Sequence, residues 1–537
     1  MSRRKFIFYN AFFSFAAVLL LISCATTSQK INPTGLSKQK YTSVITITGG
    51  EVCGILNKDK SVQIFAGIPF AAPPVGNLRW KEPQDVIPWD GVLEADHFAP
   101  MAMQKQHSRY YNFLLTLYTH TKTSRTYNGP MSEDCLYLNI WKPNETAPEG
   151  GWPVLVYIHG GSLLRGQSWL ERNDGENLAK HGIIVVNIAY RTGIFGYFAD
   201  KELALESPNN TTGNYGLLDQ IKALEWVHNN ISAFGGNADN VTIAGESAGS
   251  SSVNALCASP LTKGYFRRAI AESSSVIQQT PPHTYRTLEA ALAMGDAIKK
   301  EFNCNSVQEL RALSAEKLIE TTYQNSAMCT DGYALPETPY EIYLKGQNHE
   351  ESLINGFNTH EAFGFTYFTK VNKQNIASLF EPILKDKTDA FIQKYGTKNR
   401  KQLKALYNDV FSAVCFSYPH DCWTKAVTSQ GRPVYEYYFS RENREYGTNH
   451  SGEMIYAYRN VPKTNHYQTR DFELEEIMSS YWINFIKTGN PNGKTTTGEE
   501  LPQWQTSMQS GGLLMELGDT CSMIEDPFGY IYEYLAD

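Results

Sequence analysis

The sequence predicts an α/β fold with a large, mostly parallel central sheet flanked by helices. Three runs are apolar almost throughout, as in strands that are buried on both faces: 154–158, 183–188 and 241–244. Between the last two of these runs, apolar residues recur at helical spacing at Leu217, Leu218, Ile221, Leu224 and Val227. Strands that alternate with helices form βαβ units, and ligands then bind beyond the carboxyl ends of the strands.

Composition excludes several function classes. The chain has 537 residues, of which 42% are hydrophobic and 19% charged, which is ordinary for a globular enzyme-sized protein. A net charge of −7 without a basic stripe argues against nucleic acid as a partner. The sequence contains no C-x-x-C and no H-E-x-x-H motif, so we expect neither a metal site nor a cofactor. These patterns predict neither the oligomeric state nor the pairing of the cysteines.

The N-terminus has the features of an export signal. Arg3, Arg4 and Lys5 precede an apolar stretch that ends in Leu-Ile-Ser-Cys24, which resembles a bacterial lipobox. This pattern predicts a lipoprotein signal peptide over residues 1–24, lipidation of Cys24 and a polar tether over residues 25–40. The mature protein would then be anchored to a membrane and face the periplasm or the cell surface. A plain signal peptide and an uncleaved anchor are the alternatives.

A globular domain is expected from residue 41 to residue 537. Its start alternates in polarity and carries Gly49-Gly50 between two β-branched runs, which predicts two strands joined by a tight turn. The next stretch, residues 65–76, is rich in proline and glycine and is predicted to be a loop.

A possible nucleophile lies where a buried strand meets a helix. The run 241–244 leads into Gly245-Glu246-Ser247-Ala248-Gly249, a Gly-x-Ser-x-Gly motif followed by small residues. Such a turn is tight enough to need small neighbours, and it exposes the hydroxyl of Ser247 above the sheet. A hydroxyl so placed needs only a base to become a nucleophile. A serine-rich turn without function is the alternative.

A second glycine-rich turn ends the strand at 154–158. His159-Gly160-Gly161 resembles the oxyanion loop of lipases and esterases, in which backbone N–H groups converge on one point. By position, the donors would be the N–H groups of Gly161, Ser162 and Ala248. His159 is interpreted as a packed residue that flanks the loop, because a better candidate for the base follows later in the chain.

Several longer passages resemble one family, the type B carboxylesterases and cholinesterases. They are the proline-rich passage 65–76, the passage 132–141 (Ser-Glu-Asp-Cys-Leu-Tyr-Leu-Asn-Ile-Trp) and the passage 266–273. The resemblance implies an α/β-hydrolase fold, with the helical segments in 280–350 and 370–425 forming a wall over the active site. Two departures stand out. Ala102 occupies the place of a cysteine that pairs with the equivalent of Cys135 in many relatives, and Ser162 replaces a third glycine.

The same resemblance selects the partners of Ser247. In this fold the acid and then the histidine follow the serine along the chain. Glu361 follows a predicted strand at 352–357 and matches the family's acid, although a surface glutamate that opens a helix is the alternative. His450 matches the family's base. Ser273 matches a serine that supports the acid in relatives, or is a strand-end hydroxyl, and Glu453 matches an acid that stabilises the histidine loop.

The sequence therefore predicts a serine carboxylic ester hydrolase that acts on a small-molecule ester through an acyl-enzyme. Two alternatives are a non-catalytic interaction protein of the same fold and a lactonase or peptidase on the same scaffold. Residues 103–130, with many aromatic and leucine side chains, are either an amphipathic surface helix or a lid over the pocket.

Overall fold

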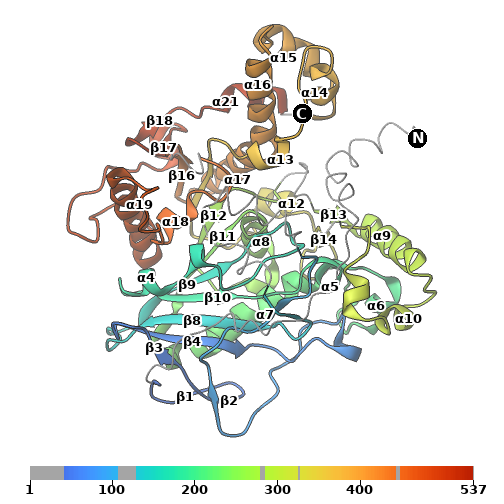
Figure 1. Ribbon diagram of the computed structural model, residues 1–537, viewed down its shortest axis with the longest axis vertical. Helices are drawn as coiled ribbons and strands as arrows, with labels where there is room; N and C mark the ends of the chain where they lie inside the picture. Colours follow the sequence, from blue (N-terminus) through green and yellow to red (C-terminus); the bar gives the residue numbers. More distant parts are fainter. Residues whose placement is uncertain (1–40, 107–128, 278–284, 325–326, 443–447, 536–537) are drawn as a thin grey trace.

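The protein is built around one mixed sheet of 11 strands, in the order β18-β17-β16-β15-β12-β11-β9-β10-β8-β4-β3 (Figure 1). The structure, a computed structural model, describes residues 41–106, 129–277, 285–324, 327–442 and 448–535. Cys24, the predicted signal peptide and most of the predicted lid, residues 107–128, lie outside the described residues. Among the helices that are described, none is both long enough and apolar enough to cross a bilayer.

The centre of the sheet is parallel, as predicted. From β10 to β17 every neighbouring pair of strands runs parallel, while β8, β4 and β3 at one edge and β18 at the other are antiparallel to their neighbours. The strands are β3 (Ile55–Leu56), β4 (Val62–Pro69), β8 (Tyr137–Pro143), β9 (Trp152–Ile158), β10 (Ile184–Ile188), β11 (Gly236–Glu246), β12 (Arg268–Glu272), β15 (Ser352–Asn358), β16 (Val434–Phe439), β17 (Leu514–Leu517) and β18 (Cys521–Ile524).

Three small sheets accompany the large one. The N-terminal sheet joins β1 (Ile45–Ile47), β2 (Gly50–Cys53) and β5 (Val92–Glu94), and its first two strands form the predicted hairpin. The other two are pairs: β6 (Met101–Ala102) with β7 (Met131–Ser132), and β13 (Arg286–Thr287) with β14 (Cys329–Thr330).

Helices cover both faces of the large sheet, which explains why its central strands are apolar throughout. In β9, Val154 and Val156 belong to the core on one face, together with side chains of α7 (Tyr215–Asn230) and α8 (Ala248–Ala258). Leu155 and Tyr157 belong to the core on the other face, with α4 (Glu176–Ala179) and α19 (Thr469–Thr488). Since each β9 side chain enters one of the two cores, no position in the strand favours a polar residue.

The segments predicted to be helical are helical, and one group of helices projects from the carboxyl-end side of the sheet (Figure 1, top). A third core joins this group, with Phe380, Phe391 and Phe411 among its buried side chains. The group comprises α14 (Ile376–Leu384), α15 (Thr388–Tyr395), α16 (Arg400–Ser412), a π-helical turn (Ala413–Ser417) and α21 (Gly529–Leu535). The helix that follows the π-helical turn, α17 (Tyr418–Ser429), instead places Trp423 and Val427 in the same core as Val154.

The remaining helices are short, apart from α9. They are α5 (Gly193–Tyr197), α6 (Lys201–Glu206), α9 (Leu288–Glu301), α10 (Val307–Arg311), α11 (Ala315–Leu318), α12 (Pro339–Leu344), α13 (Phe363–Thr366), α18 (Met454–Ala457) and α20 (Ser507–Ser510). Single 3₁₀ turns lie at Gly76–Leu78, Glu171–Asn173, Ile231–Phe234, Pro260–Thr262 and Lys385–Lys387.

The prediction of a loop over residues 65–76 is wrong for its first part. Strand β4 continues to Pro69 and pairs with β8, with a break in register between Phe65 and Ile68. Gly67 lies in this break with φ +79°, a left-handed conformation in which a side chain is unfavourable, and its α-carbon packs close to the carbonyl of His97. A β-bulge thus accommodates the glycine, and the proline ends the strand rather than interrupting it.

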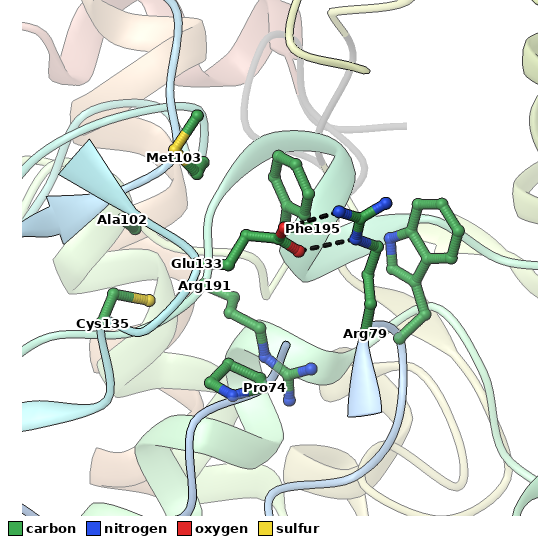
Figure 2. A pocket seen from close by; sticks show the side chains of 9 residues that line it. Pro74, Arg79, Ala102, Met103, Glu133, Cys135, Arg191 and Phe195 are labelled. Atoms are coloured by element: carbon green, nitrogen blue, oxygen red, sulfur yellow. Dashed lines mark hydrogen bonds and ion pairs between the residues drawn. The ribbon is translucent and has the colours of Figure 1, made fainter. Parts of the chain in front are cut away.

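The loop without the family's disulfide passes a small cavity (Figure 2). Cys135 is buried and unpaired, and Ala102 borders the same cavity on the same side of the view. On the opposite side, Arg79 holds Glu133 through two hydrogen bonds, of 2.6 Å and 2.5 Å, from its guanidinium to the carboxylate. This ion pair links the chain near residue 79 to the segment that carries Cys135, in the absence of a covalent bridge.

Restoring the bridge is expected to stabilise the protein. In an Ala102→Cys variant, oxidation to a disulfide with Cys135 should raise stability by about 3 kcal/mol, because the closed loop loses entropy in the unfolded chain. Thermal unfolding of the oxidised and the reduced variant measures this difference. Ala102→Ser serves as the control without a second thiol. A bridge confirmed by mass spectrometry that leaves Tm unchanged would contradict the prediction.

Candidate active site

Ser247 lies at the sharp turn that the motif predicts. It separates the end of β11 at Glu246 from the start of α8 at Ala248, with φ +59° and ψ −126°, values that a side chain seldom adopts. Its N–H donates to the carbonyl of Glu272 at 2.8 Å, which holds the turn on the sheet. Small neighbours are obligatory, since a Cβ on Gly249 would lie 2.1 Å from the carbonyl oxygen of Ile158. The strain is therefore maintained by the surrounding packing.

Glu361 and His450 meet at the same edge of the sheet. The Nδ1 atom of His450 lies 2.6 Å from Oε2 of Glu361, whose side chain is fully buried just beyond β15. The two loops that carry them are joined by a β-bridge between His360 and Asn449. Burial of this kind contradicts the alternative of a surface glutamate, and the pairing orients the imidazole as a carboxylate–histidine pair requires.

The other ring nitrogen of His450 faces a second carboxylate. Its Nε2 atom lies 3.2 Å from Oε1 of Glu246, the residue that precedes Ser247. The imidazole thus contacts the residue that precedes Ser247, and between these two described residues no hydrogen bond joins Ser247 Oγ to the ring. Hydrogen bonds of this kind often tighten only when a substrate is bound.

Two opposing effects set the proton affinity of His450. Burial of the ring disfavours its charged form, but the negative charges of Glu246 and Glu361 outweigh it and raise the pKa of His450 to about 9. The imidazole thus lies between two carboxylates that favour its charged form.

The predicted oxyanion loop lies against Ser247. A Cβ on Gly160 would lie 3.0 Å from Cβ of Ser247, so a side chain there would crowd the nucleophile. Gly161 and Ser162 both have positive φ, +113° and +59°, so Ser162 adopts a glycine-like conformation despite its side chain. Among the described residues, the N–H groups of Gly161, Ser162 and Ala248 have no acceptor in the protein, which leaves them able to bind an oxyanion.

His159 is a packed residue, as interpreted from the sequence. Its ring stacks on Tyr190 with centroids 4.3 Å apart, and Nδ1 lies 2.9 Å from the carbonyl oxygen of Gly160. Burial lowers the pKa of His159 to about 4, so the ring stays neutral. It supports the loop by contact and takes no proton from Ser247.

Comparison with known proteins agrees with this geometry. A model of the carboxylesterase family matches residues 41–528. The chain belongs to the carboxylesterase family. Carboxylesterase 1C of Rattus norvegicus is 34% identical over 89% of this chain and 90% of its own. Fumonisin B1 esterase of Sphingopyxis macrogoltabida is 32% identical over 81% of this chain and 80% of its own.

Solved structures give the same result for the fold. The crystal structure of the Geobacillus stearothermophilus carboxylesterase EST55 at pH 6.2 superposes with a TM-score of 0.77 and 28% identity. The match covers 92% of this chain and 100% of that one. The protein is a carboxylic ester hydrolase with an α/β-hydrolase fold, as its sequence indicates.

Glu453 and Ser273 differ in how they relate to the acid of this carboxylesterase. Asn358 donates its N–H to Glu361 Oε1 at 2.8 Å and its side-chain amide to Glu453 Oε2 at 2.5 Å, so it ties the two carboxyl groups together. Burial, with the charges of Glu246 and Glu361, raises the pKa of Glu453 to about 8. Ser273 makes no such contact. Its buried Oγ has no hydrogen-bond partner among the described residues, and its N–H donates to Gly356, so it is a strand-end residue.

Sequence reasoning missed several residues that surround the imidazole in this carboxylesterase. Glu246 occupies one of the two unspecified positions of the motif, and Ser451 directly follows the predicted base His450. Phe365 of α13 and Phe416 of the π-helical turn flank the ring, with centroids 5.4 Å and 4.9 Å from it. Asn358 directly follows the strand predicted at 352–357. The only signal available was position, since each lies within four residues of a predicted site residue or, for Phe416, in a segment predicted to be helical.

Proposed function

We propose that this carboxylesterase cleaves esters through an acyl-enzyme formed on Ser247, with His450 as general base and Glu361 as its partner. The observation that supports the proposal most is the 2.6 Å contact of Glu361 with Nδ1 of His450, next to the strained turn at Ser247. Nδ1 is thereby kept protonated, which leaves Nε2 as the nitrogen that accepts the serine proton.

Each step uses a group already in place. Ser247 Oγ attacks the ester carbonyl while His450 accepts its proton, and Glu361 stabilises the resulting imidazolium. The carbonyl oxygen becomes an oxyanion, which the N–H groups of Gly161, Ser162 and Ala248 would bind. His450 then protonates the departing alcohol, and water cleaves the acyl-enzyme by the same route in reverse.

The rings beside His450 favour substrates with an apolar alcohol group. Because His450 protonates the leaving oxygen, the alcohol passes next to Phe365 and Phe416, which offer aromatic surface. Hydrolysis of p-nitrophenyl and alkyl esters of graded chain length by the purified protein tests the activity and this preference. A folded protein that hydrolyses none of these esters would favour the alternative of a non-catalytic interaction protein. The presence of serine, glutamate and histidine at Ser247, Glu361 and His450 argues against that alternative.

We also propose that the protein is exported and held at a membrane by lipid on Cys24, on the strength of the lipobox-like sequence. A Cys24→Ser variant is expected to move from the membrane fraction to the soluble fraction and to lose the mass of the lipid. Cys53→Ser, which changes a buried thiol of the folded domain, is the matched control. Membrane association that survives Cys24→Ser would contradict lipid anchoring and favour an uncleaved hydrophobic anchor.

A further inference from the structure

Ser451, next to the imidazole, holds an unfavourable backbone conformation. Its φ is +69°, in the left-handed region that residues with a side chain rarely occupy. Its Oγ donates to Oε1 of Glu246 at 2.5 Å, a short hydrogen bond to a carboxylate. Strain of this kind persists where the surrounding contacts require it, and here the contact made is with Glu246.

One carboxylate oxygen serves two partners. The Oε1 atom of Glu246 that accepts from Ser451 is also the atom 3.2 Å from Nε2 of His450. Glu246 is only 1% exposed, so water cannot replace a lost donor at low cost. The hydrogen bond from the Ser451 hydroxyl therefore helps to hold the Glu246 carboxylate in place, with Oε1 aimed at the ring.

We propose that Ser451 is a positioning residue that anchors the Glu246 carboxylate opposite Nε2 of His450, so that this anchored charge helps to set the pH at which the imidazole acts as a base. The proposal rests on the proposed roles of Ser247, His450 and Glu361. It adds a resting state of the site, in which Nε2 of His450 is paired with Glu246 instead of with Ser247. Ser451 then influences the pH at which this pairing is lost.

Among the charged groups around His450, Glu246 is the one whose position depends on Ser451. Glu361 binds Nδ1, and Glu453, at the start of α18, adds negative charge from a greater distance. Phe365 and Phe416 carry no charge. The thiol of Cys415 borders Glu361, and burial raises the pKa of Cys415, so this group is neutral as well. Glu361 has a donor in the N–H of Asn358, whereas the donor to Glu246 is the hydroxyl that Ser451 supplies.

The consequence for the pH profile has a definite sign. Without the hydroxyl, the Glu246 carboxylate loses the hydrogen bond that holds it and can turn away from Nε2, so its pull on the imidazolium weakens. The pKa of His450 then falls, and the acid limb of kcat/KM moves to lower pH by about half a unit to one unit. The kcat/KM of each protein can be expressed as a fraction of its own plateau at high pH. At a pH well below the acid limb, this fraction should be about three to ten times larger in the variant than in the wild type.

The test compares Ser451→Ala and Ser451→Gly with the wild type in the full-length protein, with p-nitrophenyl acetate as substrate from pH 5 to pH 10, a range that spans the pKa of His450 of about 9. Ser451→Ala removes the hydroxyl and keeps the strain, whereas Ser451→Gly removes both and is the variant that folds without difficulty. Both are expected to shift the acid limb downward alike. A shift in the glycine variant alone would assign the effect to backbone strain and overturn the proposal, as would an unmoved or upward-shifted limb in both.

Glu246→Gln completes the design. Removal of the charge should shift the limb in the same direction, and the double variant Ser451→Ala/Glu246→Gln should shift it no further than Glu246→Gln alone, because the hydroxyl acts through that carboxylate. Additive shifts would contradict the proposal. If the wild type hydrolyses no ester, it is the proposed function that fails, whereas an active wild type with unmoved variants refutes only the role of Ser451.

Discussion

Replacing Ser247 by alanine is expected to lower kcat for ester hydrolysis by about 10⁴-fold or more. The hydroxyl is the atom that would bond to the acyl group, and no neighbouring group in the described site can substitute for it at the same place. Ser247 lies at a turn whose conformation is set by contacts of Gly249 with Ile158 and by the N–H bond to Glu272, so alanine should leave the backbone unchanged. Substrate binding should therefore survive, and KM should change far less than kcat.

A serine in the following helix provides the control. Ser252 lies in α8, and its hydroxyl donates to the carbonyl of Ala248 at 3.0 Å, away from any reacting atom. Ser252→Ala is expected to keep the wild-type kcat, apart from a modest loss of stability. A Ser247→Ala protein that unfolds at the wild-type temperature and still turns over esters at the wild-type rate would exclude Ser247 as the nucleophile.

Replacing Glu361 by glutamine is expected to lower kcat by a similar factor, about 10⁴. The amide keeps the shape of the side chain but no longer stabilises an imidazolium or a proton on Nδ1. Glu246 makes the loss more severe, because its carboxylate at 3.2 Å from Nε2 then favours a proton on that nitrogen, the tautomer that cannot accept one from Ser247.

The pH profile of Glu361→Gln separates this role from a general loss of structure. The charge of Glu361 raises the pKa of His450 towards about 9, so its removal should shift the acid limb to lower pH while the plateau falls. Glu436→Gln is a matched control: Glu436 is buried in β16, where burial raises its pKa to about 8, and it bonds to Thr424 and Ser507 instead of the imidazole. A Glu361→Gln enzyme with the plateau and limb of the wild type would refute the assignment.

The sequence was sufficient for the parts of the molecule that depend on backbone pattern. Buried strands such as β9 and β11 are apolar because both their faces enter a core, and the turn at Ser247 needs glycines on both sides for steric reasons. Chain order then selected Glu361 and His450, which the structure brings within 2.6 Å. The loop predicted at 65–76 failed because proline and glycine were read as breakers, whereas a bulge at Gly67 lets β4 continue.

Contacts between side chains from distant segments could not be predicted in the same way. That Ser451 reaches Glu246, 205 residues earlier in the chain, depends on how the β16 loop folds back over β11. That Asn358 joins Glu361 to Glu453 depends on the rotation of one side chain, and Phe416 reaches the imidazole only because a π-helical turn interrupts the helix there. The choice between the two interpretations of Ser273, a support for the acid or a strand-end hydroxyl, depends on such a contact as well, and its Oγ has no hydrogen-bond partner among the described residues.

The most direct test of the proposed mechanism is covalent labelling of the protein with a fluorophosphonate, followed by mass spectrometry of its peptides. Such a reagent forms a stable adduct with a serine that a neighbouring base activates. The account predicts one adduct per chain, on Ser247, at a rate that rises as the pH approaches about 9 and His450 loses its proton. Ester hydrolysis by a protein that carries no adduct on Ser247, or that carries it on another residue, would contradict the account.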